Sequence, residues 1–215
     1  MIYKAAIFDL DGTLVNSLED LADATNYALR TFKQPGHTAE AIQQMIGEGT
    51  RTLISKTLGQ DKQHLIEDVL KKMREKYIQI CLDKTRPYKG LLEVVAELVY
   101  KKDAKLAVLT NKDQKMAQKI VCHFFNGYFQ IIKGTTDAIA VKPEPQEALQ
   151  LLDKLRVKPQ ETIFVGDSAT DVQTAKAAGI KMVGVSWGFR GKEELIKAGA
   201  ETIVNEPKQL LEFFA

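Results

Sequence analysis

The stretch Lys4-Ala-Ala-Ile-Phe-Asp-Leu-Asp-Gly-Thr-Leu14 contains a short apolar run, which is followed by two carboxylates, Asp9 and Asp11. A short apolar run that ends at a turn signal is typical of a strand buried inside a parallel sheet. Open α/β sheets bind ligands at the carboxyl ends of such strands, where the strand order reverses. The two aspartates are therefore predicted to lie at a ligand-binding edge.

Further β-rich runs follow this first one, and helical patterns fill most intervals after residue 90. This alternation predicts βαβ units and an α/β fold with a doubly wound parallel sheet. The strands are expected at residues 4–9, 105–110, 129–133, 162–166, 181–186 and 202–204.

The sequence between the first two runs has only helical periodicity and is too long for one crossover. Apolar stripes at spacings of three and four residues predict helices at 18–32 and 65–81, with shorter ones at 38–46 and 50–58. Ser17 is expected to cap the first of them. Together they predict a small bundle inserted into the core.

Helix-breaking residues between Leu82 and Gly90 indicate where the chain returns to the main domain. The expected domains are a core of residues 1–16 and 84–215 and a helical cap of residues 17–83. The core carries the strands, so it is expected to carry the chemistry.

The bulk composition is that of an ordinary globular protein. Of 215 residues, 45% are hydrophobic and 27% charged, and the net charge is +2. With this balance of charges and no basic run, the sequence does not predict the basic surface that nucleic-acid binding requires. No apolar stretch is long enough to span a membrane, and two early aspartates argue against a signal peptide. We expect a cytoplasmic monomer or homodimer that acts on a small metabolite.

Other polar residues join the first acidic pair in suggesting phosphate chemistry. Asp167 and Asp171 follow the run at 162–166, Thr110 ends the run at 105–110, and Lys142 precedes a proline. A phosphate ester repels a carboxylate nucleophile, so this chemistry needs a divalent cation and groups that hold the phosphoryl oxygens. Mg²⁺ is suited because it takes a few carboxylates and keeps several waters.

Each of these residues also has a simpler interpretation. A calcium loop fails because Leu14 and Asp20 stand where that loop needs glycine and glutamate. An isolated Asp-x-Asp-Gly can be a solvated turn, and a lysine such as Lys142 is usually exposed. Ser168 can be an N-cap with Asp171 as its partner in the first turn, which leaves Asp167 unexplained.

Four segments in order make the chain resemble the haloacid dehalogenase superfamily, specifically its capped phosphatases of the phosphoglycolate phosphatase type. The resemblance covers essentially the whole length and includes a helical insert after the first segment. The segments are Asp9-Leu-Asp-Gly-Thr-Leu, Leu109-Thr-Asn-Lys, Val141-Lys-Pro-Glu-Pro and Val165-Gly-Asp-Ser-Ala-Thr-Asp.

The resemblance implies roles for the acidic residues. Asp9 would be the nucleophile that forms an aspartyl-phosphate, and Asp11 would protonate the leaving alkoxide and later deprotonate water. Asp9, the backbone carbonyl of Asp11 and Asp167 would hold Mg²⁺, with Asp171 a further ligand or a partner of one. The strand bearing the first segment would lie between those bearing the second and fourth.

It also implies how phosphate and substrate are bound. Thr110, Lys142 and backbone N–H groups near Asp11, Gly12 and Asn111 would bind the phosphoryl oxygens. The insert would act as a lid, and its glycine-bearing segment would face the leaving group. The substrate-binding residues expected there are Gly47, Gly49, Thr50 and Arg51. The arginine can pair with a carboxylate such as that of glycolate, or simply be solvated.

The function predicted from sequence is therefore a Mg²⁺-dependent phosphatase of small phosphomonoesters, with 2-phosphoglycolate as the best single substrate. Inorganic pyrophosphatase and sugar-phosphate mutase are neighbouring enzymatic alternatives. A phospho-accepting signalling module is the non-enzymatic alternative, although such a module needs neither a lid nor a general acid.

Overall fold

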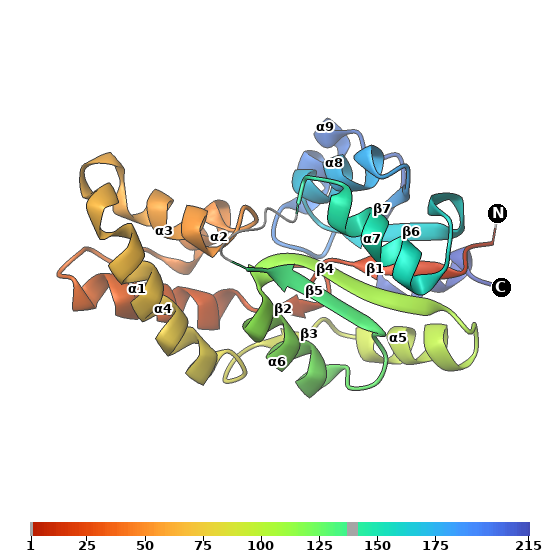
Figure 1. Ribbon diagram of the computed structural model, residues 1–215, viewed down its shortest axis with the longest axis horizontal. Helices are drawn as coiled ribbons and strands as arrows, with labels where there is room; N and C mark the ends of the chain where they lie inside the picture. Colours follow the sequence, from red (N-terminus) through yellow and green to blue (C-terminus); the bar gives the residue numbers. More distant parts are fainter. Residues whose placement is uncertain (1, 137–141) are drawn as a thin grey trace. The chain divides into compact units, whose positions relative to one another are not determined.

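The computed structural model describes residues 2–136 and 142–215, so Val141 of the third segment lies outside the described residues. Its main feature is a six-stranded sheet in which every described pair of neighbours is parallel (Figure 1). The strand order is β5-β4-β1-β6-β7-β8. The strands are β1 (Ala5–Phe8), β4 (Lys105–Asp113), β5 (Ile131–Thr135), β6 (Thr162–Gly166), β7 (Lys181–Val185) and β8 (Ile203–Val204).

The predicted doubly wound α/β fold is confirmed. Strand β1 lies between β4 and β6, so the first, second and fourth segments end side by side at one edge of the sheet. Strand β4 runs three residues further than predicted, to Asp113 rather than residue 110. Its register with β5 shifts between Leu109 and Asp113, which marks a bulge or irregularity at the edge where ligands are expected.

Helices cover both faces of this sheet. In Figure 1, α7, α8 and α9 lie on one side and α5 and α6 on the other. The side chains of Ile7, Leu109, Leu151, Phe164 and Val172 belong to one buried cluster that joins the sheet to its helices. The helices are α5 (Leu91–Tyr100), α6 (Gln114–Phe124), α7 (Gln146–Leu155), α8 (Ala169–Ala177) and α9 (Gly191–Ala198), with 3₁₀ turns at Pro159–Glu161 and Pro207–Phe213.

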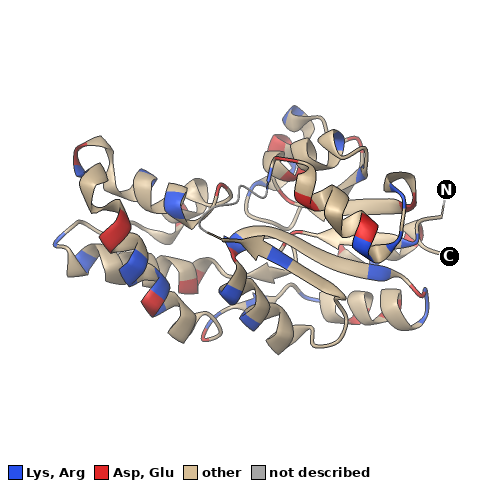
Figure 2. Ribbon diagram, viewed as in Figure 1, with Lys and Arg blue, Asp and Glu red and all other residues tan. Residues whose placement is uncertain are grey.

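The chain divides into two compact units. One comprises residues up to Asn16 and from Pro87 onward, and the other is Ser17–Arg86. Strands β2 (Val15–Asn16) and β3 (Arg86–Pro87) form a separate two-stranded sheet where the chain passes from one unit to the other. Acidic and basic positions are interspersed along the elements of both units, as expected for a nearly balanced charge (Figure 2).

The second unit is helical, as its periodicity predicts. Its helices are α1 (Leu18–Thr31), α2 (Ala39–Met45), α3 (Thr50–Leu58) and α4 (Ile66–Ile80), with a 3₁₀ helix at Gln60–Leu65. Helices α1 and α4 pack against each other and bury the predicted apolar stripes, including Leu21, Leu29, Val69 and Met73. Among the described residues, no helix combines the length and apolar character needed to cross a bilayer.

The predicted capping role of Ser17 is wrong. Ser17 precedes α1 and is buried, but its side chain makes no capping hydrogen bond. A different first-turn residue organises this end of the helix. The buried carboxylate of Asp20 accepts hydrogen bonds from the backbone N–H groups of Lys84 and Thr85 and from the Thr85 hydroxyl, at 2.7–3.1 Å. Asp20 thus ties the start of α1 to the segment where the chain leaves this unit.

We expect Asp20→Ala to lower the free energy of unfolding by about 3 kcal/mol, because buried N–H donors lose a charged acceptor. Urea unfolding followed by circular dichroism measures the loss. Asp23→Ala is the matched control, because exposed Asp23 pairs with the half-exposed ammonium of Lys84 and should contribute less than about 1 kcal/mol. If the two variants lose the same free energy of unfolding, the hydrogen bonds of Asp20 do not stabilise this unit more than the exposed ion pair does.

Candidate active site

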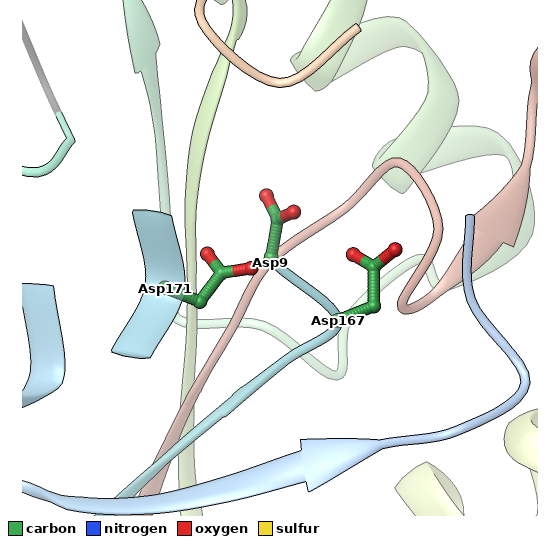
Figure 3. Close-up of side chains that lie close together, drawn as sticks. All are labelled: Asp9, Asp167 and Asp171. Atoms are coloured by element: carbon green, nitrogen blue, oxygen red, sulfur yellow. The ribbon is translucent and has the colours of Figure 1, made fainter. Parts of the chain in front are cut away.

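Three carboxylates converge where β1 and β6 end (Figure 3). Asp9 follows β1, Asp167 follows β6, and Asp171 lies in the first turn of α8. Each of them offers an oxygen, and the three atoms lie within 4.8 Å of one another. All three residues are buried. The structure thus brings Asp9 together with two aspartates that lie more than 150 residues further along the sequence. The carboxylate of Asp11 is not part of this cluster and contacts Lys112.

The environment makes ionisation of this cluster costly. Burial is the main cause that raises the pKa of Asp9 to about 6, with Lys142 opposing it and Asp171 adding to it. Burial, followed by the charges of Asp171 and Asp9, also raises the pKa of Asp167 well above its usual value. More negative charge is therefore concentrated here than the neighbouring lysine neutralises.

Lys142 is buried among these carboxylates and not exposed. Its Nζ lies 2.8 Å from Asp9 Oδ1 and 2.6 Å from Asp171 Oδ1. Burial alone would lower the pKa of Lys142, but the charges of Asp171 and Asp9 raise it, so the side chain stays a cation. The ammonium therefore stands where it can neutralise negative charge that gathers beside Asp9.

Asn111 fixes the backbone of Lys142. The Lys142 N–H donates to Asn111 Oδ1 at 3.0 Å, and Asn111 Nδ2 donates to the Lys142 carbonyl at 3.1 Å. The side chain of Asn111 is thus engaged with the third segment, whereas the predicted contact with phosphate concerns its backbone N–H. Thr110, also buried, lies beside it, and its Oγ1 accepts the Lys112 N–H at 3.2 Å.

Asp171 has two kinds of contact at once. Its Oδ2 accepts hydrogen bonds from Ser168 N at 3.0 Å and Ser168 Oγ at 2.7 Å, which completes a capping box at the start of α8. Its Oδ1 accepts from Lys142. The interpretation of Asp171 as the partner of Ser168 is therefore confirmed, and Asp171 contacts Lys142 while it caps the helix. Its role beside a metal ion stays a prediction.

Asp167 is held from two sides. Its Oδ2 accepts the Phe189 N–H at 2.7 Å, and its Oδ1 accepts the Thr13 hydroxyl at 3.3 Å. Gly12 and Gly188 approach this carboxylate so closely that a Cβ at either position would overlap it. Gly12 has φ +89°, which also favours glycine. The predicted phosphate-binding glycine thus also makes room for a carboxylate.

Asp11 has a partner that the sequence did not indicate. Lys112 Nζ lies 2.9 Å from each of the two Asp11 carboxylate oxygens. The two residues are 101 positions apart, and a lysine at a strand end usually reaches into solvent. Its place in the second segment was the only available signal.

The predicted cap residues lie in the second unit. Gly47 and Gly49 both have positive φ, and α3 begins at Thr50. The guanidinium of Arg51 forms an ion pair with Glu67, and both side chains are largely exposed. Their contacts with a substrate stay a prediction.

The donor set of the acidic cluster is suited to a divalent cation. Three carboxylates supply hard oxygen ligands, which Mg²⁺ prefers. Asp9 Oδ1 is buried and forms no hydrogen bond of good geometry with any described residue, although Lys142 Nζ lies 2.8 Å away. A cation bound here would also relieve the repulsion that raises the pKa of Asp9 and Asp167.

Buried carboxylates and a lysine at the central strands of a doubly wound sheet are typical of proteins that act on phosphate groups. A family model, "Haloacid dehalogenase-like hydrolase", matches residues 6–185. The chain belongs to this family of hydrolases, as the resemblance of its four segments predicts.

Known relatives match over nearly the full length. The phosphoglycolate phosphatase of Haemophilus influenzae strain 86-028NP is 33% identical, with 97% of each chain covered. That of Aquifex aeolicus is 31% identical over 86% of each chain. A crystal structure of a candidate phosphoglycolate phosphatase from Lactobacillus delbrueckii subsp. bulgaricus matches with a TM-score of 0.92, 30% identity and complete coverage of both chains.

Proposed function

We propose that this protein is a Mg²⁺-dependent phosphatase that hydrolyses small phosphomonoesters through a phosphoryl group carried on Asp9, with 2-phosphoglycolate as its substrate. The observation that carries the proposal is the buried Asp9 carboxylate, which lies beside the cation of Lys142 and within reach of Asp167 and Asp171. The names of the relatives support the choice of substrate.

In the first step, an oxygen of the Asp9 carboxylate attacks phosphorus and the bond from phosphorus to the ester oxygen breaks. The alkoxide that leaves takes a proton from the Asp11 carboxyl group. Lys142, Thr110 and the backbone N–H groups near Gly12 and Asn111 stabilise the negative charge on the phosphoryl oxygens. The products of this half-reaction are an alcohol and an acyl phosphate on Asp9.

In the second step, Asp11 accepts a proton from water as the water oxygen attacks phosphorus. The bond between phosphorus and Asp9 breaks, so inorganic phosphate leaves and the carboxylate is restored. Asp9, the carbonyl of Asp11 and Asp167, with Asp171 as a further ligand or neighbour, are the residues that would hold Mg²⁺. The ion would screen the repulsion between a carboxylate nucleophile and an anionic ester.

Substrate selection tests the proposal. Purified protein with Mg²⁺ is assayed for phosphate release from a panel that includes 2-phosphoglycolate, ethyl phosphate and pyrophosphate, ranked by kcat/KM. Ethyl phosphate is the matched control because it differs from 2-phosphoglycolate only in having a methyl group in place of the carboxylate. We expect 2-phosphoglycolate to rank first. Faster hydrolysis of pyrophosphate would favour a pyrophosphatase, and bisphosphate formation a mutase.

The proposed substrate contacts of Gly47, Gly49, Thr50 and Arg51 are tested in the same assay. If Arg51 binds the substrate carboxylate, Arg51→Gln should lower kcat/KM for 2-phosphoglycolate and leave that for ethyl phosphate unchanged. If kcat/KM for 2-phosphoglycolate is the same in Arg51→Gln as in wild type, Arg51 does not have this role.

We further propose a cytoplasmic monomer or homodimer, on the basis of composition and charge balance.

Binding of Mg²⁺ should raise the melting temperature of the wild-type protein, because an ion bound only to the folded state stabilises it by about 2.7 kcal/mol at one hundred times Kd. Differential scanning fluorimetry with Mg²⁺ or EDTA measures the shift. It should be larger above pH about 6 than below it, because protonation of Asp9, whose pKa is raised to about 6, competes with the metal.

Asp167→Asn should remove the Mg²⁺-dependent shift, since one carboxylate ligand is lost. Asp153→Asn, at an exposed position on α7, is the matched control and should keep it. An unchanged shift in Asp167→Asn would contradict the assignment of Asp167 as a ligand.

A further inference from the structure

Two buried lysines, Lys112 and Lys142, form ion pairs with different carboxylates at the edge of the sheet where β1 and β6 end. Lys142 contacts Asp9 and Asp171, while Lys112 contacts both carboxylate oxygens of Asp11. The two aspartates of the first segment, which are assigned different tasks, therefore have separate cationic partners. The proposed reaction does not use Lys112, the lysine that follows Asn111 in the second segment.

The contact between Lys112 and Asp11 restricts how the carboxyl group can turn. Equal distances of 2.9 Å from Nζ to both oxygens place the ammonium on the bisector of the carboxylate. Rotation about the last side-chain bond would break one of the two contacts. A carboxylate at a site open to substrate would otherwise sample several orientations.

The ion pair between Lys112 and Asp11 is buried, unlike a pair that forms by chance on the surface. The side chain of Lys112 is only 4% exposed, and that of Asp11 is 12% exposed. A buried ammonium is costly unless it is paired, so the fold places Lys112 here at the expense of its hydration. The ion pair is also shielded from the solvent and salt that weaken surface pairs.

The end of β4 explains how a strand residue reaches Asp11. Strand β4 extends beyond β1, whose pairing with it ends at Phe8 and Val108. The register with β5 shifts between Leu109 and Asp113, and such irregularities re-aim side chains next to functional sites. The Lys112 N–H also donates to Thr110 Oγ1, which fixes the backbone from which the lysine extends.

We propose that Lys112 is a positioning residue that holds the carboxyl group of Asp11 in the orientation in which it delivers a proton to the leaving alkoxide. This inference rests on the proposed function, because it assumes that Asp11 is the group that protonates the leaving oxygen. Lys112 itself need not touch the substrate. Its effect should depend on how much help the leaving group requires.

A comparison of two esters tests this role. An alkyl phosphate must have its leaving oxygen protonated, whereas p-nitrophenyl phosphate releases a stable anion without a proton. The ratio kcat/KM covers every step up to the first phosphoryl transfer, so it reports departure of the leaving group. We expect Lys112→Met to lower kcat/KM for the alkyl ester about 100-fold, and that for p-nitrophenyl phosphate much less.

Two further variants sharpen the comparison. Lys112→Arg keeps a cation that can contact both carboxylate oxygens, so it should recover part of the activity towards the alkyl ester. Lys115→Met, at an exposed position in the first turn of α6, is the matched control and should leave both esters unaffected. Equal losses for the two esters in Lys112→Met would overturn the proposal, because a purely structural lysine would affect both alike.

Crystal structures of wild type and Lys112→Met give a second readout that does not depend on turnover. We expect the Asp11 carboxylate to turn away from its wild-type orientation, with β1 and β4 unchanged. An Asp11 side chain that keeps its orientation would overturn the proposal whatever the kinetics. If wild type releases no phosphate from any ester, the proposed function fails, and this comparison alone decides the structural role of Lys112.

Discussion

Asp9→Asn should lower kcat by at least about ten-thousandfold, the largest kinetic effect of any single substitution in this chain. The carboxamide has the shape of the carboxylate but cannot form the acyl phosphate. Lys142 keeps Asp171 as its partner, so the variant should still fold. Phosphate release with 2-phosphoglycolate and Mg²⁺ measures the loss, and unchanged circular dichroism establishes that the fold is intact.

Asp11→Asn is the matched variant for this prediction. It should lose multiple turnover and yet retain Asp9 as a phosphate acceptor, which acetyl phosphate can reveal because its leaving group needs no proton. A phospho-accepting signalling module would show no multiple turnover even in wild type. Turnover in Asp9→Asn close to that of wild type would contradict the assignment of the nucleophile.

Lys142→Met should have the largest effect on stability, with a loss of about 3–5 kcal/mol in EDTA near pH 7.5. The substitution leaves Asp9 and Asp171 buried without their cation, which lies 2.8 and 2.6 Å from them in the structure. Urea unfolding measures the loss. Activity should fall as well, because the charge beside the phosphoryl oxygens is gone.

The pH dependence of this loss distinguishes lost charge pairing from lost packing. The raised pKa of Asp9, about 6, means that the folded state takes up a proton more readily than the unfolded state does. Removal of Lys142 takes away a charge that lowers this pKa, so the pKa of Asp9 in the variant should lie above about 6. The stability difference from wild type should therefore shrink as pH falls from 7.5 towards about 6. A loss of stability that does not depend on pH would contradict the explanation by lost charge pairing.

Lys133→Met is the matched control for Lys142→Met. Its partner Glu147 is buried, but the side chain of Lys133 is partly exposed, so this variant should lose less free energy of unfolding.

Regular periodicity made most of the fold predictable. The stripes at 18–32 and 65–81 became α1 and α4, and the apolar runs became the strands of a parallel sheet. The end of β4 was placed too early because Asn111 and Lys112 are polar, although both are buried. The role of Ser17 was wrong because a cap depends on side-chain geometry, which residue type alone does not determine.

Prediction of the site depended on which contacts are local. Asp171 and Ser168 are three residues apart, so their capping box was visible in the sequence. The contact between Lys112 and Asp11 depends on strand order and on an irregular register, neither of which leaves a local pattern. The clustering of Asp9 with Asp167 was expected from the resemblance, which supplied the strand order.

The central claim is that Asp9 carries the phosphoryl group during turnover. The most direct test is to mix the enzyme with Mg²⁺ and 2-phosphoglycolate, quench it in acid within milliseconds, reduce with borohydride and analyse the peptides by mass spectrometry. An acyl phosphate is reduced to homoserine, so the account predicts homoserine at position 9 and no modification of Asp11. Turnover with an unmodified Asp9 at every quench time, or a phosphoryl group on another residue, would contradict it.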